Sequence, residues 1–129
     1  MNINNTVIPG CRELIPKGLR DERGSFVKTF QQGLYSGKAL KTAFAEEYYS
    51  WSRHGVLRGL HFQTPPYDHV KLVYCVSGSV LDVVLDVRKG SPTYGQHVQV
   101  ELSADKANML YIPAGLAHGF YVTGDHAIM

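Results

Sequence analysis

Short apolar runs, separated by glycine, proline and asparagine, repeat along the chain from residue 48 onward. Short runs at this spacing are typical of β-sandwiches and barrels. The pattern therefore predicts an all-β fold, with strands over Phe44–Ser52, Val56–Phe62, Val70–Ser77, Ser79–Arg88, His97–Leu102, Asn108–Ile112 and Gly119–Val122.

The run Ser79–Arg88 alternates in a way that predicts which side chains face inward. Successive side chains of a strand point to opposite faces, so Val80, Asp82, Val84, Asp86 and Arg88 share one face. Asp82 is therefore expected to point toward the core. The only segment with a helical pattern is Gly33–Ala43, which contains a glycine and predicts one or two turns.

The length of the chain, 129 residues, suits one domain with one hydrophobic core. No repeat, low-complexity tract or linker divides it. We expect a single domain over residues 1–129, with 1–43 as an N-terminal arm and 44–129 as the barrel.

Charge and apolar content exclude several classes of partner. Thirteen Lys and Arg oppose eleven Asp and Glu, for a net charge of +2, which is too balanced for a nucleic-acid or membrane-surface binder. The N-terminus MNINNTVIPG does not resemble a signal peptide, and no apolar run is long enough to span a bilayer. Cys11 and Cys75 lack CxxC spacing and are expected to be free thiols. We therefore expect a cytoplasmic protein.

Two segments reproduce parts of the metal-binding pattern of cupin barrels, and one of them is altered. Pro113, Gly115 and His118 form an uninterrupted PxGxxH. Upstream, His61 is followed by Gln63 in place of a second histidine, and Lys71 stands where cupins place a glutamate. An ammonium group donates hydrogen bonds and cannot ligate a cation. We therefore expect no metal and no other cofactor.

Two histidines and a lysine facing one cavity suit proton abstraction next to a carbonyl. Such chemistry needs a base near neutral pKa and fixed positive charge for the enolate oxygen. His61 is the candidate base and Lys71 the oxyanion partner. Taken singly, a strand histidine is more often a core residue and a lysine a surface residue, so the interpretation depends on their joint placement.

Two arginines have ambiguous positions. Arg58 lies three residues before His61, which places it on the opposite face of a regular strand unless a bulge at Gly59 redirects it. Arg23 lies in the turn-forming sequence DERG, where a solvated hairpin tip is the simpler interpretation and a phosphate contact the alternative.

Four long segments, DERGSF, HGVLRGLHFQTPP, KLVYCVSGSVLDVVLDVRKGSPTYG and IPAGLAHGF, closely resemble the dTDP-4-dehydrorhamnose 3,5-epimerase family, in order and over nearly the whole chain. The resemblance implies a cupin-type double-stranded β-helix, or jelly-roll barrel. It implies a homodimer that exchanges N-terminal strands and epimerises a nucleoside-diphosphate 4-keto-6-deoxy sugar in deoxysugar biosynthesis without a metal.

The resemblance also assigns residues. His61 matches the general base, Lys71 and His118 match substrate contacts, and Arg58 matches a diphosphate ligand. Arg23 matches a substrate contact that reaches the partner subunit's site. Gln63, Glu46 and Tyr48 fall in segments where the family contacts its substrate, and we expect them to line the substrate site.

The chain departs from the family pattern at three places. Lys28 stands where the family commonly has a glutamate, and Glu46, Glu47 and Tyr48 replace a Gln-Asp/Glu-Asn run. The family's proton-donating tyrosine, the carboxylate that pairs with the base and the final strands would follow Met129, so we expect the barrel to be incomplete at its C-terminus.

The sequence also allows three other functions. A 3,4-ketoisomerase uses the same barrel and enolate chemistry, although the LRGLHFQ and DERG segments resemble the epimerases. An inactive paralogue would bind the sugar nucleotide without proton exchange. A metal-dependent cupin would bind a cation through His61 and His118.

Overall fold

The computed structural model describes all residues, 1–129, and is built almost entirely of strands. The elements, in chain order, are β1 (Asn2–Asn5), β2 (Arg12–Ile15), β3 (Gly18–Asp21), β4 (Gly24–Val27), α1 (Gln32–Ser36), β5 (Trp51–Arg53), β6 (Leu57–His61), β7 (Lys71–Tyr74), β8 (Ser77–Asp86), β9 (His97–Ser103), β10 (Met109–Ile112) and β11 (Leu116–Ile128). No helix is long and apolar enough to cross a membrane. The all-β prediction is confirmed.

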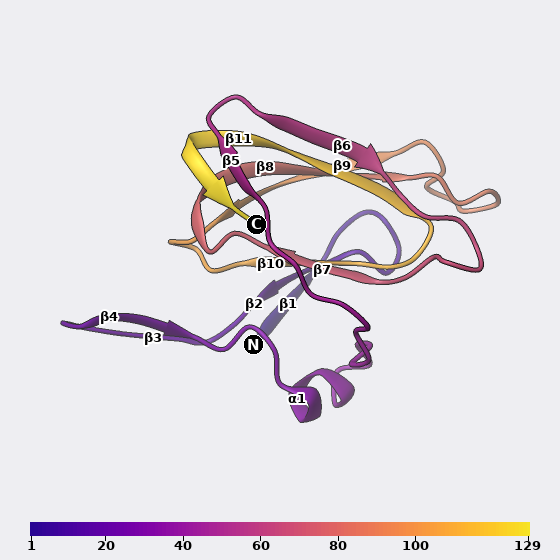
Figure 1. The fold of residues 1–129 in the computed structure, drawn as a ribbon. Helices are drawn as coiled ribbons and strands as arrows, with labels where there is room; N and C mark the ends of the chain where they lie inside the picture. The colour runs from indigo at the N-terminus through magenta and orange to yellow at the C-terminus, as the bar shows by residue number, and fades with distance from the viewer.

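The strands form two layers that face each other across the core (Figure 1). One sheet has the order β1-β2-β10-β7, and the other has the order β5-β11-β8-β9, with β6 also paired to β11. A cluster of buried side chains, which includes Val80, Val84 and Phe120, fills the space between the layers. The fold is the predicted double-layered barrel of the cupin type.

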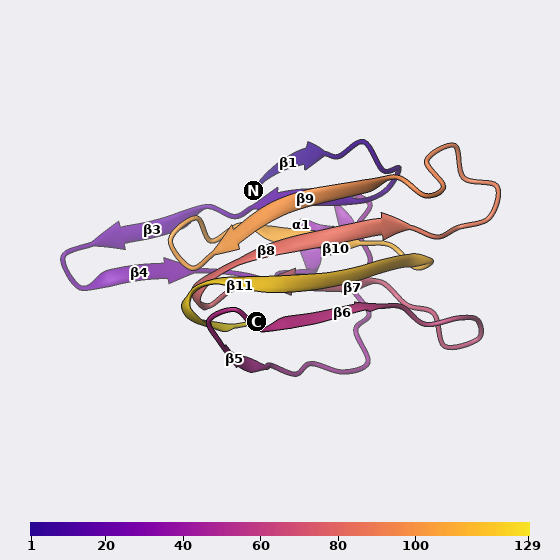
Figure 2. The ribbon, with the colours of Figure 1, turned by 90° about the horizontal axis from the view of Figure 1, so that it is seen from above.

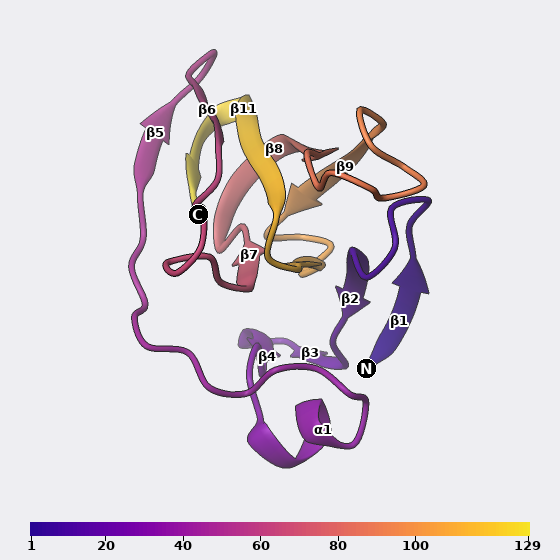
Figure 3. The same ribbon diagram turned by 90° about the vertical axis from the view of Figure 1, so that its right-hand side faces the viewer.

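The β3–β4 hairpin extends away from both layers and forms a separate two-stranded sheet (Figure 2). Its residues Leu19 and Phe26 lie opposite each other in register and are 72% and 61% exposed. The predicted arm, residues 1–43, therefore consists of two parts that lie in different places. Strands β1 and β2 join the sheet of β10 and β7, whereas the hairpin and α1 lie outside it (Figure 3).

Two element predictions are wrong. The strand predicted over Phe44–Ser52 begins only at Trp51, because residues 44–49 are all exposed and the ladder to the end of the chain begins where Ser50 pairs with Met129. The helix covers Gln32–Ser36 and ends at Gly37, well before Ala43. The glycine there exposes backbone and weakens a helix that is already too short to be stable alone.

The alternation predicted for Ser79–Arg88 is confirmed where it matters most. In β8 the buried residues are Val80, Asp82, Val84 and Asp86, and Asp82 is fully buried. The strand pairs with β11 along most of its length, so the inward-pointing side chains of the two strands lie next to each other. This places a carboxyl group inside the barrel, next to the strand that carries His118.

Candidate active site

His61 and His118 lie side by side on neighbouring strands. His61 ends β6 and is directly opposite His118 in β11, so both side chains project from the same face. Their ring centroids are 5.3 Å apart, with the ring planes tilted by 60°. His118 is buried, whereas His61 is open to solvent. The two histidines of the altered cupin pattern thus meet at one place.

An irregularity between β6 and β11 settles the ambiguous position of Arg58. The register shifts between His118 and Phe120, so that Arg58 lies opposite Phe120 and Gly59 is accommodated as an extra residue. Phe120 points inward like His118, and Arg58 therefore shares the face of His61. Its Nε donates a hydrogen bond of 2.9 Å to Ser52 Oγ, and the side chain remains solvent-exposed.

Gly59 makes this bulge possible. Its φ of +112° lies in the range that favours glycine, and a Cβ built there would lie 2.7 Å from Gly119 Cα and 2.8 Å from the His118 carbonyl oxygen. Gly119 is equally constrained, since its Cβ would lie 2.5 Å from the Arg58 carbonyl oxygen. Two facing glycines therefore let the backbones of β6 and β11 approach closely at the histidine pair.

Lys71 begins β7, on the opposite sheet, and is partly buried. Burial lowers its pKa below the ordinary value for lysine. The pKa of His61 is also lowered, first because its exposed side chain is still partly removed from water and then by the charges of His118 and Lys71, while Asp82 acts in the opposite direction. The surroundings of His61 thus favour the neutral imidazole, which is the form that can accept a proton.

Asp82 is a member of the site that the sequence did not assign. Its Oδ2 lies 3.4 Å from His118 Nδ1, which is too long for a good hydrogen bond, and both carboxyl oxygens and Nδ1 are buried without a hydrogen-bond partner. Burial raises the pKa of Asp82, and the neighbouring His118 opposes this. The only signal in the sequence was the inward face of the β8 alternation, which placed Asp82 inside without a partner.

The remaining predicted residues do not join this cluster within one chain. Gln63 follows β6 and is exposed, and neither Glu46 nor Tyr48 makes a side-chain hydrogen bond. Arg23 lies at the tip of the β3–β4 hairpin, where its Nη2 is 2.6 Å from Asp21 Oδ2. The hairpin tip and the end of β6 that carries His61 are at opposite ends of the molecule (Figures 1 and 2).

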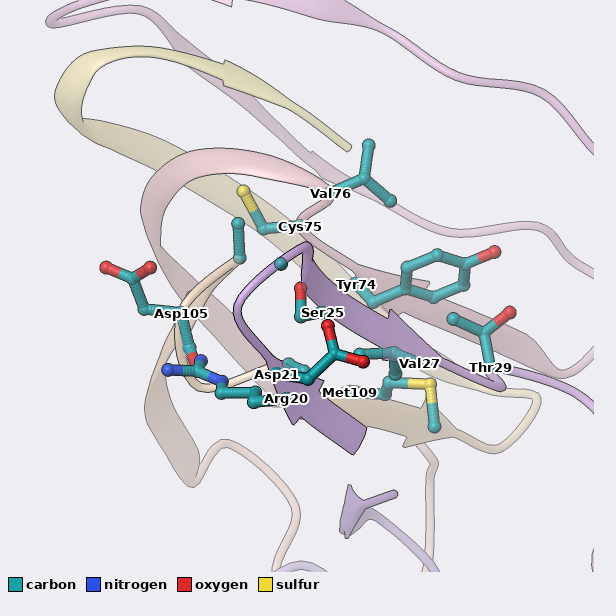
Figure 4. Close-up of a pocket in the computed structure, with 13 residues that line it drawn as sticks. Arg20, Asp21, Ser25, Val27, Thr29, Tyr74, Cys75, Val76, Asp105 and Met109 are labelled. Atoms are coloured by element: carbon teal, nitrogen blue, oxygen red, sulfur yellow. The ribbon is translucent and has the colours of Figure 1, made fainter. Parts of the chain in front are cut away.

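A cavity of about 550 Å³ lies elsewhere, alongside the hairpin. Its lining includes Arg20 and Val27 from the hairpin, Tyr74 from the end of β7, Cys75 just after it, and Met109 from β10 (Figure 4). None of the predicted site residues lines it. The predicted catalytic residues therefore lie at the histidine cluster and not at this cavity.

The cluster suits proton transfer. A neutral imidazole beside a second imidazole and an ammonium group combines a base with donors for a developing negative charge. The side chains in the cluster that could ligate a metal are His61, His118 and Asp82. They are not arranged to hold a metal ion, and neither is any other group of three His, Cys, Asp or Glu residues.

Comparisons with known proteins identify the family. The sequence model described as dTDP-4-dehydrorhamnose 3,5-epimerase matches residues 5–129. An enzyme of that name from Shigella flexneri is 47% identical over 128 residues, which are 98% of this chain and 71% of that protein.

Solved structures agree with the sequence comparison. The Legionella pneumophila dTDP-6-deoxy-D-glucose-3,5-epimerase, crystallised with dTDP-4-keto-L-rhamnose, has a TM-score of 0.92 at 42% identity, covering 98% of this chain and 68% of that one. The Bacillus anthracis dTDP-4-dehydrorhamnose 3,5-epimerase, with TDP and PPi bound, has a TM-score of 0.94 at 34% identity, covering 98% and 73%. This chain belongs to the dTDP-4-dehydrorhamnose 3,5-epimerase family.

Proposed function

We propose that this chain is a metal-independent epimerase that inverts C3, C5 or both in a nucleoside-diphosphate 4-keto-6-deoxy sugar, in the synthesis of a deoxysugar of the rhamnose type. The observation that carries the proposal is the pairing of His61 with His118 across β6 and β11, with Lys71 near enough to lower the pKa of His61. The relatives named above, which are 3,5-epimerases, support it.

His61 is the proposed base. A ketone at C4 acidifies the hydrogens on the neighbouring carbons C3 and C5. When His61 removes one of them, the electron pair of the C–H bond moves to the C4 oxygen and forms an enolate. Epimerisation is complete when a proton returns to the same carbon from the opposite face. The lowered pKa keeps His61 unprotonated and ready to accept the proton at neutral pH.

Lys71 and His118 are proposed to stabilise the enolate oxygen. Positive charge and hydrogen-bond donors that are already in place stabilise a developing oxyanion more than water does, because they need not reorganise. Arg58, which shares the face of His61 and is held by Ser52, is the proposed ligand of the diphosphate. Gln63, Glu46 and Tyr48 are proposed to contact the remainder of the substrate.

We also propose that the chain forms a homodimer in which the hairpin of one subunit reaches the site of the other. The support is the exposed pair Leu19 and Phe26, on a hairpin that leaves its own barrel, with Arg23 at the tip. Exposed apolar pairs of this kind mark interaction surfaces. Replacing both Leu19 and Phe26 by serine should convert a dimer to a monomer in light scattering, whereas a chain that is monomeric before the change contradicts the proposal.

The nucleotide-sugar substrate and the free, buried thiols of Cys11 and Cys75 favour the cytoplasm as the site of action.

Solvent deuterium tests the catalytic proposal. In D₂O, proton NMR should show that a dTDP-4-keto-6-deoxy sugar loses its C3 or C5 proton signal in the presence of the chain. The His61→Asn variant should abolish the loss, and His97→Asn, an exposed histidine on β9, should leave it unchanged. Movement of the keto group from C4 to C3 would indicate a ketoisomerase instead. Substrate binding without exchange would indicate a binding module.

A further inference from the structure

Asp86, at the end of β8, is bound by an unusually complete set of donors. The carboxylate is fully buried. Its Oδ1 accepts hydrogen bonds from the Arg88 backbone N–H at 3.0 Å and from Arg88 Nε at 2.9 Å. Its Oδ2 accepts from Arg88 Nη2 at 2.8 Å and from the hydroxyls of Ser91 and Thr93, each at 2.6 Å. These hydrogen bonds, first that from the Arg88 side chain, hold the pKa of Asp86 well below its usual range.

Arg88 connects this carboxylate to the turn that begins β11. A Cβ built on Gly115 would lie 2.6 Å from Arg88 Cγ and 3.1 Å from Cδ, so the stem of the arginine lies directly against the Gly115 backbone. Gly115 has a φ of +81° and immediately precedes Leu116, the first residue of β11. The guanidinium is fixed by Asp86, and its stem therefore braces the turn.

The braced turn sits three residues before His118. In the β8–β11 ladder Leu116 is opposite Asp86, His118 is opposite Val84, and Phe120 is opposite Asp82. At the far end of the same ladder the register shifts between Val122 and Ala127. The regular register that makes Asp82 a diagonal neighbour of His118 is thus anchored at the Asp86 end, since the other end contains an irregularity.

We propose that Arg88, oriented by Asp86, is a positioning residue that fixes His118 relative to His61 and Asp82. Arg88 touches no reacting group and acts through Gly115 and the first residues of β11. The proposal rests on the proposed function for its effect on catalysis, while its effect on the histidine geometry can be measured without substrate.

A bidentate arginine suits this task better than a lysine would. The planar fork fixes the guanidinium in two directions, so the stem cannot swing away from Gly115 while the ion pair holds. The pair is also largely shielded, because the side chain of Arg88 is 29% exposed and that of Asp86 is not exposed at all. Shielding makes this contact more rigid than the exposed pair of Lys106 and Glu101, at 3.1 Å.

The first test measures the geometry of the ligand-free chain. His61 and His118 have ring centroids 5.3 Å apart, which is close enough for a nuclear Overhauser effect between ring protons. Arg88→Met keeps an unbranched stem but removes the fork, and it should weaken this signal. Lys106→Met, which breaks the exposed ion pair on β9 and the following turn, should leave the signal unchanged.

The second test measures turnover by solvent-deuterium exchange. A displacement of about 1 Å in a reacting group can lower a rate by about 100-fold, so Arg88→Met should lower kcat by about that factor with little change in KM. Arg88→Lys, which keeps the charge and the stem, should recover part of the loss. A general loss of folded protein would instead lower the active fraction, which unfolding measurements reveal, and would not produce the graded order Arg, Lys, Met.

The outcomes separate the two proposals. If the wild-type chain exchanges no deuterium, the proposed function fails, and the ring-proton signal still decides the role of Arg88. If a folded Arg88→Met variant keeps both the ring-proton signal and kcat, Arg88 is not a positioning residue. A loss of kcat with an unchanged ring-proton signal also contradicts the proposal. If Arg88→Met does not fold, Arg88→Lys provides both measurements.

Discussion

Replacing Gly59 by alanine tests whether the close approach of β6 and β11 builds the site. The new methyl group would lie 2.7 Å from Gly119 Cα and 2.8 Å from the His118 carbonyl oxygen, and neither backbone atom can rotate away. A residue with a side chain in a sparsely populated conformation costs about 1–3 kcal/mol. Overpacking adds about 1–3 kcal/mol. The free energy of unfolding should therefore fall by roughly 2–6 kcal/mol in total.

Gly90→Ala is the matched control. Gly90 also has a positive φ, +84°, but a Cβ there would meet nothing within 4 Å. It therefore isolates the conformational cost of about 1–3 kcal/mol. Urea unfolding followed by circular dichroism gives both values, and their difference measures the close approach. Deuterium exchange on the same proteins should be lost in Gly59→Ala and kept in Gly90→Ala. A Gly59→Ala variant that is no less stable than Gly90→Ala and exchanges deuterium at the wild-type rate would show that the close approach of β6 and β11 does not build the site.

Three further predictions concern the charges around His61. Lys71→Met should lower kcat for exchange by about 10²–10³, the usual cost of one oxyanion donor; an unchanged kcat removes Lys71 from the mechanism. Because the pKa of His61 lies below 6.5 and protonation disables a base, the acid limb of the exchange rate should fall below pH 6.5. In Lys71→Met the acid limb should move to higher pH, because the charge that lowers the pKa of His61 is removed. An acid limb above pH 6.5 in the wild type contradicts the assignment of His61 as the base. Burial raises the pKa of Asp82 in the folded chain, so this carboxyl group loses its proton at a lower pH in the unfolded chain than in the folded one. The free energy of unfolding therefore falls as the pH rises above 3.8. Asp82→Asn should remove this loss, so that its stability advantage over the wild type grows from pH 4 to pH 8 in urea unfolding. The exposed Asp68→Asn should show no such trend.

The features predicted well from the sequence are those with a strong period or a fixed spacing. The alternation of β8 located the inward face of Asp82 because a half-buried strand must separate its apolar and polar sides. The two halves of the altered cupin pattern predicted that His61 and His118 face one site, and the two residues lie opposite each other on β6 and β11. Strands β1 to β4 were not predicted, because each has only four residues, and β1, β3 and β4 are also mostly exposed.

Other features depend on contacts between strands that a single sequence does not reveal. Arg58 shares the face of His61 only because the register shifts opposite Gly119. The 3.4 Å approach of Asp82 to His118 depends on the register of β8 against β11. The helix was predicted to be too long because the periodicity of Gly33–Ala43 continues beyond Gly37, where the helix ends.

The most direct test of the account is the fate of the substrate's C3 and C5 protons in D₂O. Incubating the 129-residue chain with a dTDP-4-keto-6-deoxy sugar should replace at least one of these protons by deuterium. The exchange should disappear in His61→Asn and persist in His97→Asn. Exchange that continues unchanged in His61→Asn, or a folded wild-type chain that binds the sugar nucleotide and exchanges neither proton, would contradict the central claim that His61 is the base.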